Sequence, residues 1–369
     1  MITKPSQEDW YYIHNVEHTD SPALIIFPDR IQQNINTMIN MVRDVNRLRP
    51  HVKTHKMSEV VQMQLDAGIW KFKCATIAEA EMLGELEVQD VLIAYQPVGP
   101  KIQRVLKLTQ KFPQTRFSIL VDDQQNAKKI ASIFHKSDAS ISLFLDLDVG
   151  MHRTGIDPAN AIELYSYCES ILGVNPIGIH AYDGHVHHEN SELRQAAADE
   201  VNVLLDKLSV TIKEEIEVVV SGSPSFPYHA KRKKYTCSPG TSLLWDWRYS
   251  TLCEDQDLQH AAIVIARVIS KPSKNLICVD LGHKSIASEM SFPRVHFMNL
   301  PNAKQVIHSE EHLVLEVNDN STVNIGDVLY GVPMHICPTV ALHETALVVQ
   351  NQDVVDTWNV IARKRRITI

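Results

Sequence analysis

The sequence predicts an α/β protein in which a (β/α)8 barrel is followed by a compact all-β domain. Two observations support this fold class. Strand-like apolar runs alternate with helical patterns up to about residue 250, and short β-rich runs without long helices follow. The chain of 369 residues is also long enough for a large barrel and a second module. The expected domains are a barrel over residues 28–250 and a β domain over 251–369.

The first apolar run, residues 23–27, ends at Pro28, and Asp29 caps the helical pattern that follows. Because this strand precedes the barrel, we expect residues 22–27 to join the β domain. The predicted barrel strands end near Lys53, Ala75, Tyr95, Val121, Asp148, Tyr182, Ser221 and Leu244. The predicted helices cover Ser58–Ala67, Thr76–Leu86, Pro100–Phe112, Asp123–Lys136, Pro158–Leu172 and Ser191–Glu215. A doubly wound open sheet is disfavoured, since no glycine-rich nucleotide turn follows the first strand.

The β domain is predicted from six short runs separated by polar turns. They cover Ala261–Ile269, Leu276–Val279, His312–Val317, Val328–Tyr330, Thr345–Val349 and Val354–Ile361.

Composition restricts the class of protein. Hydrophobic residues make up 44% and charged residues 22%, as in ordinary soluble proteins, and the net charge of −8 argues against binding to nucleic acid or anionic membranes. We interpret the basic run of residues 231–234 as a solvated surface. The six cysteines show no paired spacing, which is typical of a reducing compartment. With neither a signal-peptide pattern nor a run of ~18 apolar residues, the expected location is cytoplasmic.

The most informative stretch is residues 49–56, in which Lys53 follows the first predicted barrel strand between His51 and His55. Imidazole and ammonium neighbours favour the uncharged, nucleophilic form of a lysine, so Lys53 is a candidate Schiff-base amine. An ordinary loop lysine in a basic turn is the alternative from this stretch alone.

Polar groups also follow other predicted strands, at the face where barrels carry their catalytic residues. These loops cover residues 148–155, 180–188, 221–225 and 238–242. The last two are rich in Gly, Ser and Thr, a composition that suits a phosphate. Together with Lys53 they suggest pyridoxal phosphate bound as a Schiff base.

Several motifs resemble those of the D-threonine aldolase and D-serine dehydratase family, whose barrel is of the alanine-racemase type. They are residues 50–56 (PHVKTHK), 150–155 (GMHRTG), 182–185 (YDGH), 221–224 (SGSP), 239–241 (PGT), 280–284 (DLGHK), 309–312 (SEEH) and 333–339 (PMHICPT). The resemblance covers nearly the whole chain. It implies that Lys53 carries pyridoxal phosphate, that Arg153 contacts the phenolic oxygen of the ring, and that Tyr182 lies against the cofactor. The matching phosphate-binding residues are Ser221, Gly222, Ser223, Gly240 and Thr241.

His335 and Cys337 are candidate metal ligands. In an extended stretch, residues two apart point to the same side, so the imidazole and the thiolate could share one cation. Two ligands leave coordination positions open, as in a catalytic site. The resemblance strengthens this interpretation, but aldolases of the family tend to carry an aspartate where this chain has Cys337, whereas eukaryotic-type serine dehydratases carry a cysteine. A thiolate favours zinc, with manganese as the alternative.

The resemblance implies a lyase that acts on β-hydroxy D-amino acids, by aldol cleavage or by dehydration. It also implies a homodimer, because proteins with a barrel of the alanine-racemase type form head-to-tail dimers. An amino-acid racemase of the same fold is one alternative. A metal-dependent barrel hydrolase using His185, His187 and His188, and a noncatalytic pyridoxal-phosphate carrier, are alternatives from other classes.

Overall fold

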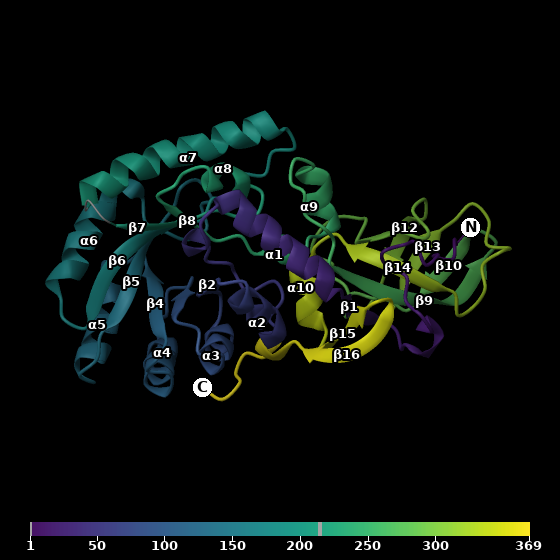
Figure 1. Cartoon of the computed structure of the whole chain (residues 1–369), viewed down its shortest axis with the longest axis horizontal. Helices are drawn as coiled ribbons and strands as arrows, with labels where there is room; N and C mark the ends of the chain where they lie inside the picture. Colours follow the sequence, from purple (N-terminus) through teal and green to yellow (C-terminus); the bar gives the residue numbers. More distant parts are fainter. Residues whose placement is uncertain (1, 213–215) are drawn as a thin grey trace. The chain divides into compact units, whose positions relative to one another are not determined.

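The structure, a computed structural model, describes residues 2–212 and 216–369. The chain forms two compact units (Figure 1). The barrel unit comprises Asn36–Lys53, Val60–Ser242 and Lys364–Ile369. The β unit comprises the chain up to Ile35, together with Thr54–Glu59 and Leu243–Arg363.

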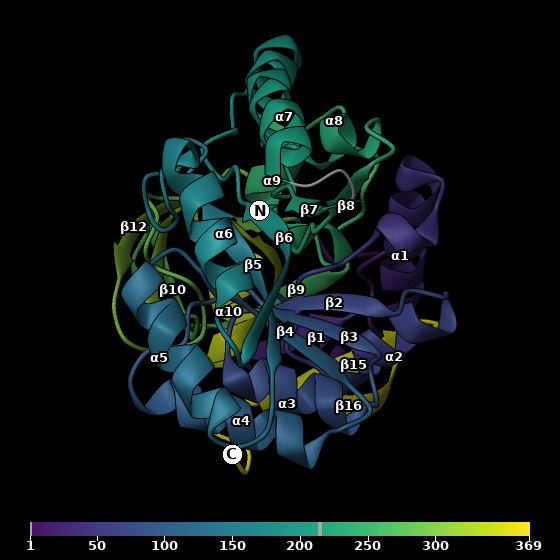
Figure 2. The ribbon, with the colours of Figure 1, turned by 90° about the vertical axis from the view of Figure 1, so that its left-hand side faces the viewer.

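Seven parallel strands, β2 to β8, form the sheet of the barrel unit in sequence order. They are β2 (Lys71–Cys74), β3 (Asp90–Ile93), β4 (Arg116–Val121), β5 (Ile141–Leu147), β6 (Val174–Ala181), β7 (Glu217–Val220) and β8 (Tyr235–Cys237). Helices of the same unit lie outside these strands in Figure 2. They are α3 (Ile77–Glu85), α4 (Pro100–Lys111), α5 (Gln124–His135), α6 (Ala161–Ser170), α7 (Ser191–Ile212) and α8 (Phe226–Ala230). Since the sheet is covered on its outer face and filled inside, its strands are apolar over most of their length.

The first predicted barrel strand is not a regular strand, although its segment links the two edges of the sheet. Leu48 forms a parallel bridge with Cys237 of β8, and His51 forms one with Lys73 of β2. Pro50 lies between the two bridges and has no N–H group, so it cannot donate to a continuous ladder. The barrel therefore consists of seven strands and one irregular segment, where the sequence predicted eight strands.

The eighth predicted strand was placed too far along the chain. Strand β8 ends at Cys237, not near Leu244, because Pro239 and Gly240 follow it and a 3₁₀ turn forms over Thr241–Leu243. The predicted helices agree with α2 (Ser58–Asp66) and α3 to α7 within a few residues, except that Pro158–Asn160 form a separate 3₁₀ turn before α6. The last three residues of the predicted helix at 191–215 lie outside the described residues.

The polar interior of the barrel contains charges at both ends of its strands. At the amino-terminal ends, buried Arg49 pairs with Asp90 at 2.6 Å and with Glu217 at 3.2 Å. Asp90 and Glu217 are the first residues of β3 and β7. Charges at this end of a barrel serve stability, so the functional residues are sought at the opposite, carboxyl ends of the strands.

The β unit contains a nine-stranded sheet, which agrees with the predicted β domain. Strand β1 (Ala23–Ile26) pairs antiparallel with β9 (Ala262–Ser273) and parallel with β15 (Thr345–Gln350). The other strands are β10 (Leu276–Val279), β11 (Val295–Phe297), β12 (Lys304–His308), β13 (Leu313–Glu316), β14 (Val328–Pro333) and β16 (Asp353–Asn359). The sequence did not predict β11 and β12, nor the short helices α9 (Trp247–Leu252) and α10 (Ile336–Leu342).

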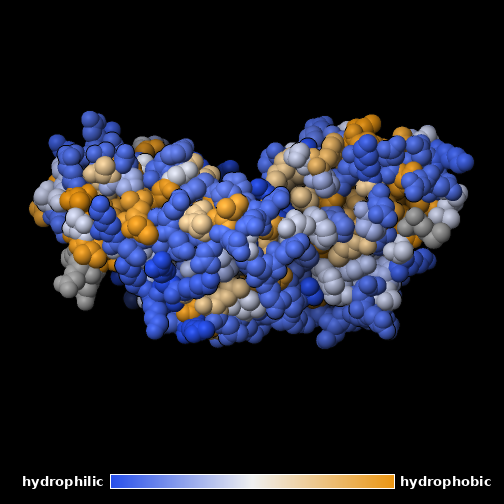
Figure 3. All heavy atoms as spheres, turned by 90° about the horizontal axis from the view of Figure 1, so that it is seen from above, coloured by the Kyte–Doolittle hydropathy of each residue, from blue (hydrophilic) through white to orange (hydrophobic). Residues whose placement is uncertain are grey.

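The surface is mostly hydrophilic on the face seen in Figure 3, where hydrophobic residues appear in separate groups. Within the described part of the chain, none of the helices combines the length and the apolar character needed to cross a bilayer.

Candidate active site

Lys53 follows the irregular segment that links β8 to β2. The backbone N–H of Val52 donates to the carbonyl of Lys73 at 2.9 Å, so the position of Lys53 is fixed by strand β2. The N–H of Lys53 itself donates to Nδ1 of His51 at 3.2 Å. His51 is therefore oriented by the backbone of Lys53.

The Tyr182 ring is the common neighbour of three cationic side chains in the barrel unit. Its centroid lies 5.6 Å from Nζ of Lys53, 5.9 Å from Nζ of Lys73 and 4.9 Å from Cζ of Arg153. A Cβ atom at Gly184 would lie 2.4 Å from Cε1 of Tyr182, so glycine is required there for the ring to take this position. The structure thus brings the predicted residues Lys53, Arg153 and Tyr182 together.

The two predicted phosphate loops are joined to each other. The Ser223 hydroxyl oxygen accepts the backbone N–H groups of Gly240, at 3.2 Å, and Thr241, at 3.0 Å. The N–H of Gly222 donates to Oδ1 of Asp183 at 2.9 Å. These three N–H groups have protein acceptors in this structure. A phosphate would have to take the place of such an acceptor to bind them.

Behind the Tyr182 loop lies a buried polar network that the sequence did not reveal. Asp183 contacts Nε2 of His229 at 2.7 Å and accepts from the Ser225 hydroxyl at 2.9 Å. Nδ1 of His229 lies 2.8 Å from Oδ1 of Asn202. Burial raises the pKa of Asp183, but His229, Ser225 and the Gly222 N–H outweigh it, so the pKa is lowered and the carboxylate stays charged. The network therefore fixes the loops after β6 and β7 relative to each other.

A second unpredicted pair, Asp146 and His180, lies near the carboxyl ends of β5 and β6. Nδ1 of His180 is 2.7 Å from Oδ1 of Asp146, whose other oxygen accepts from the Thr154 hydroxyl at 2.9 Å. Burial lowers the pKa of His180 despite this contact. Among the described residues, Nε2 of His180 is buried without a hydrogen-bond partner, and so is the Ser242 hydroxyl in the loop after β8. Buried polar atoms without a partner are costly and are commonly satisfied by a ligand or by water.

Lys73 is the third unpredicted group. It lies on β2, is only 2% exposed, and donates from Nζ to the Ser238 hydroxyl oxygen. Burial, reinforced by the positive charge of Lys53, lowers the pKa of Lys73 to about 7. The sequence signal was weak, because the strand KFKC alternates lysine with apolar residues and this pattern also fits a lysine exposed to solvent.

This donor set fits pyridoxal phosphate. The cofactor is an anionic aromatic aldehyde, and the site offers amines for the aldehyde, the Arg153 guanidinium for an anionic oxygen, and the Tyr182 ring for an aromatic face. His180 and Ser242 add polar atoms that have no hydrogen-bond partner in the described part of the chain.

The predicted metal ligands lie in the β unit and contact each other, although not in the predicted extended stretch. Strand β14 ends at Pro333, His335 precedes the first residue of α10, and Cys337 is inside this helix. The two side chains are hydrogen-bonded to each other. Nδ1 of His335 lies 2.5 Å from Oε1 of Glu289, and Sγ of Cys337 lies 3.1 Å from Oγ1 of Thr54.

The surroundings of His335 favour the positively charged form of its imidazole. Burial lowers the pKa of His335, but the contacts with Cys337 and Glu289 and the charge of Asp246 outweigh it and raise the pKa to about 9. An imidazole beside a thiol is the donor chemistry that zinc prefers. No cluster of three or more His, Cys, Asp or Glu side chains suited to a metal occurs among residues 2–212 and 216–369. His185, His187 and His188 therefore do not form a metal cluster with other described residues.

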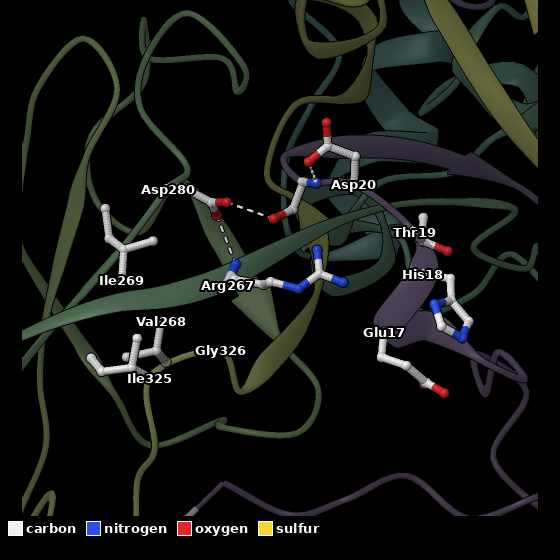
Figure 4. Close-up of a pocket in the computed structure, with 11 residues that line it drawn as sticks. Glu17, His18, Thr19, Asp20, Arg267, Val268, Ile269, Asp280, Ile325 and Gly326 are labelled. Carbon is white, nitrogen blue, oxygen red and sulfur yellow. Dashed lines mark hydrogen bonds between the residues drawn. The ribbon is translucent and has the colours of Figure 1, made fainter.

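The β unit also contains an open polar pocket of about 510 Å³ (Figure 4). Asp280 there accepts from the backbone N–H of Arg267 at 2.7 Å and from the Ser21 hydroxyl at 2.5 Å. The guanidinium of Arg267 donates to the Val16 carbonyl at 2.8 Å. Both side chains therefore have hydrogen-bond partners within the protein, and none of the predicted site residues lines this pocket.

Two family models match the chain: the alanine racemase N-terminal domain over residues 26–244, and a putative serine dehydratase domain over residues 261–349. A D-threonine aldolase of Arthrobacter sp. is 29% identical over 93% of each chain. A 3-hydroxy-D-aspartate aldolase of Paracoccus denitrificans is 27% identical over 93% of this chain and 92% of its own length. A D-serine dehydratase of Dictyostelium discoideum is 22% identical over 92% of this chain and 95% of its own.

Solved structures agree with these relatives. The crystal structure of D-threonine aldolase from Filomicrobium marinum has a TM-score of 0.87 and 26% identity, covering 94% of this chain and 96% of its own. D-threo-3-hydroxyaspartate dehydratase from Delftia sp. HT23, at 21% identity and a TM-score of 0.82 over 93% of this chain and 98% of its own, shares the fold. The predicted fold class and family are confirmed. The chain belongs to the alanine racemase N-terminal domain family, and within it resembles the D-threonine aldolases and D-serine dehydratases.

Proposed function

We propose that this protein is a pyridoxal-phosphate-dependent lyase that cleaves β-hydroxy D-amino acids with the help of a divalent cation. The observation that carries the proposal is the convergence of Lys53 and Arg153 on the Tyr182 ring in the barrel unit. Relatives that match 92–93% of this chain are named as aldolases and dehydratases of D-threonine, 3-hydroxy-D-aspartate and D-serine. The enzyme class predicted from the sequence, a lyase, is that of these relatives.

The residues of the barrel unit would hold and use the cofactor. Lys53, which lies with Arg153 beside the Tyr182 ring, would supply the amine for its aldehyde. Arg153 would bind an anionic oxygen, and Tyr182 would support the ring. The predicted contacts of the phosphate are Ser221, Gly222, Ser223, Gly240 and Thr241. When bound, pyridoxal phosphate supplies an electron sink for a bond broken at Cα of the substrate. A Lys53 amine that is not bonded to the cofactor would be available as a base.

His335 and Cys337 would hold the cation, which is zinc in the proposal because of the thiolate. A cation there would act as a Lewis acid on the β-hydroxyl of the substrate. Thr54, which contacts Cys337 at 3.1 Å, directly follows Lys53 in the sequence. A single peptide bond therefore joins Lys53 to a residue that contacts a proposed metal ligand. In addition, one structural neighbour is a metal-free cysteine-to-alanine mutant of D-threo-3-hydroxyaspartate dehydratase.

Two lyase outcomes follow from the same groups. If Lys53 removes the Cα proton, the Cβ–O bond breaks, hydroxide leaves and takes up a proton as water, and the remaining enamine hydrolyses to a 2-oxo acid and ammonia. If the β-hydroxyl loses its proton instead, the Cα–Cβ bond breaks. An aldehyde then leaves and Cα gains a proton to give glycine. The first outcome is dehydration and the second is aldol cleavage.

The products should identify the reaction. With D-threonine, D-serine and D-3-hydroxyaspartate assayed side by side, we expect cleavage of at least one D-substrate and none of its L-enantiomer. Glycine plus aldehyde indicates aldolase, and 2-oxo acid plus ammonia indicates dehydratase. Measurement by chiral chromatography also detects racemisation. Formation of the L-enantiomer without cleavage would contradict the proposed lyase.

We also propose a homodimer, as expected for a barrel of the alanine-racemase type. Sedimentation velocity should give a mass near twice 41.7 kDa at the protein concentrations used for assays. A fully active species with the mass of one chain would contradict this expectation.

A further inference from the structure

Lys73 is placed at the candidate site by strand β2. Its backbone N–H donates to the Pro50 carbonyl, and its carbonyl accepts from Val52 N–H, both at 2.9 Å. These two bonds hold Lys73 beside the segment that leads to Lys53. Its side chain reaches the Ser238 hydroxyl and lies 5.9 Å from the Tyr182 ring centroid. The amines of Lys73 and Lys53 thus both lie near the Tyr182 ring.

The Ser238 hydroxyl links Lys73 to the loops after β7 and β8. Its oxygen lies 3.1 Å from the Val220 carbonyl and 3.3 Å from the Ser221 carbonyl, both of which can only accept. The Ser238 proton is therefore used towards a backbone carbonyl, and its oxygen lone pair accepts from Lys73. Ser238 acts as a positioning residue for the Lys73 amine.

The positive charge of Lys73 has no partner in ion-pair contact among the described residues. Lys71, two residues earlier on the same strand, pairs with Glu217 at 3.5 Å. The positive charges of Lys53 and Arg49 disfavour the charged form of Lys73. The carboxylates of Asp183 and Asp146 favour the charged form, although neither contacts the Lys73 amine. His180 and Arg153 also face this cluster. A buried ammonium without a contacting anion is unstable unless it loses its proton or a ligand supplies the negative charge.

We propose that Lys73, held by Ser238, is a further cofactor-binding residue that donates to an anionic or lone-pair acceptor of the cofactor. This inference rests on the proposed function for the identity of the ligand. The shared chemistry is that of a phosphorylated pyridine, whose acceptors are the phosphate oxygens and the polar edge of the ring. Because burial and Lys53 hold the pKa of Lys73 near 7, the amine is largely neutral above that pH in the empty protein. An anion bound beside it raises this pKa, so ligand binding takes up a proton.

The test uses pyridoxine 5′-phosphate, an alcohol that cannot react with Lys53. Calorimetric titration at pH 8 in two buffers of different ionisation enthalpy gives both the dissociation constant and the number of protons taken up. For the unmodified protein we expect uptake approaching about one proton. Lys73→Met should abolish this uptake and weaken binding roughly ten- to a hundredfold, as expected for the loss of a charged hydrogen bond. Titration with pyridoxine, which lacks the phosphate, identifies the acceptor of Lys73. If Lys73 contacts the ring, Lys73→Met weakens the binding of both ligands. If Lys73 contacts the phosphate, the variant weakens the binding of the phosphorylated ligand only.

Lys71→Met is the matched control, since it removes a lysine from the same strand and should leave affinity and proton uptake unchanged. Lys73→Arg keeps the charge, so it should retain most of the affinity but take up no proton. This variant decides the question if Lys73→Met does not fold. Equal affinity and equal proton uptake in Lys73→Met, or unchanged uptake in Lys73→Arg, would overturn the inference. Borohydride trapping of pyridoxal phosphate on Lys53 tests the proposed function separately, because it does not require Lys73.

Discussion

Replacement of Lys53 by alanine is expected to produce a colourless protein that no longer holds pyridoxal phosphate covalently and has lost lyase turnover. The loss should be on the order of ten-thousandfold or more, since the same side chain supplies the covalent attachment and the base. Lys73 lies 5.9 Å from the same Tyr182 centroid and is the one other lysine found at this ring among the described residues. Residual labelling in Lys53→Ala should therefore be sought on Lys73.

The measurement is absorbance after addition of pyridoxal phosphate, followed by borohydride reduction and peptide mass analysis. The unmodified protein should be yellow and should carry the reduced cofactor on the peptide that contains Lys53. Lys107→Ala, which changes an exposed lysine on α4, serves as the control and should behave as the unmodified protein. An unmodified protein that gains neither absorbance nor label would contradict the proposed cofactor and leave the hydrolase alternative.

The parts of the fold that the sequence predicted are those with a strong local signal. Amphipathic spacing located α4 and α5 within a residue or two, because one side of each helix packs on the sheet and the other faces solvent. Strand β8 was misplaced because its three residues are followed by Pro239 and Gly240, and an apolar pair farther on, Leu243 and Leu244, resembled its end. Strands β11 (VHF) and β12 (KQVIH) were not predicted because they are short and each contains only two apolar residues.

At the site, the sequence identified residues in loop motifs, but it missed the buried network around Asp183 and the strand residue Lys73. Lys53, Arg153 and Tyr182 occur in motifs, and the structure places Lys53 and Arg153 beside the Tyr182 ring. Lys73 alternates with Phe72 and Cys74, a pattern that usually indicates a solvent-facing lysine. In a barrel the outer face is covered by helices and the inner face can be polar, so the same alternation directs a lysine inward. Only the closed arrangement of the strands reveals this.

For His335 and Cys337, the sequence predicted the pair but not its backbone conformation. A spacing of two suggested an extended backbone, but a helix begins between His335 and Cys337. The two side chains nevertheless contact each other. His335 is extended and directly precedes α10, and Cys337 is the second residue of that helix. Spacing therefore identified the pair without identifying its backbone.

Removal of the metal, by chelation or by Cys337→Ala, is expected to lower lyase turnover on the order of a thousandfold while the yellow colour remains. A Lewis acid at the β-hydroxyl contributes several kcal/mol to the transition state, which corresponds to this loss. The colour should remain because Lys53, Arg153 and Tyr182 belong to the barrel unit and Cys337 does not. Cys278→Ala is the control, since it removes a buried cysteine from β10 of the same unit.

Cys337→Asp tests the nature of the cation. An oxygen ligand in place of the thiolate should shift the preferred metal from zinc towards manganese, as judged by reconstituting the metal-free variant with each ion. Dialysed protein should be checked by elemental analysis, and turnover should return in proportion to the metal bound. Full turnover by metal-free Cys337→Ala would remove the cation from the mechanism. A racemase activity would then be favoured, because exchange of the Cα proton needs no group that polarises the β-hydroxyl.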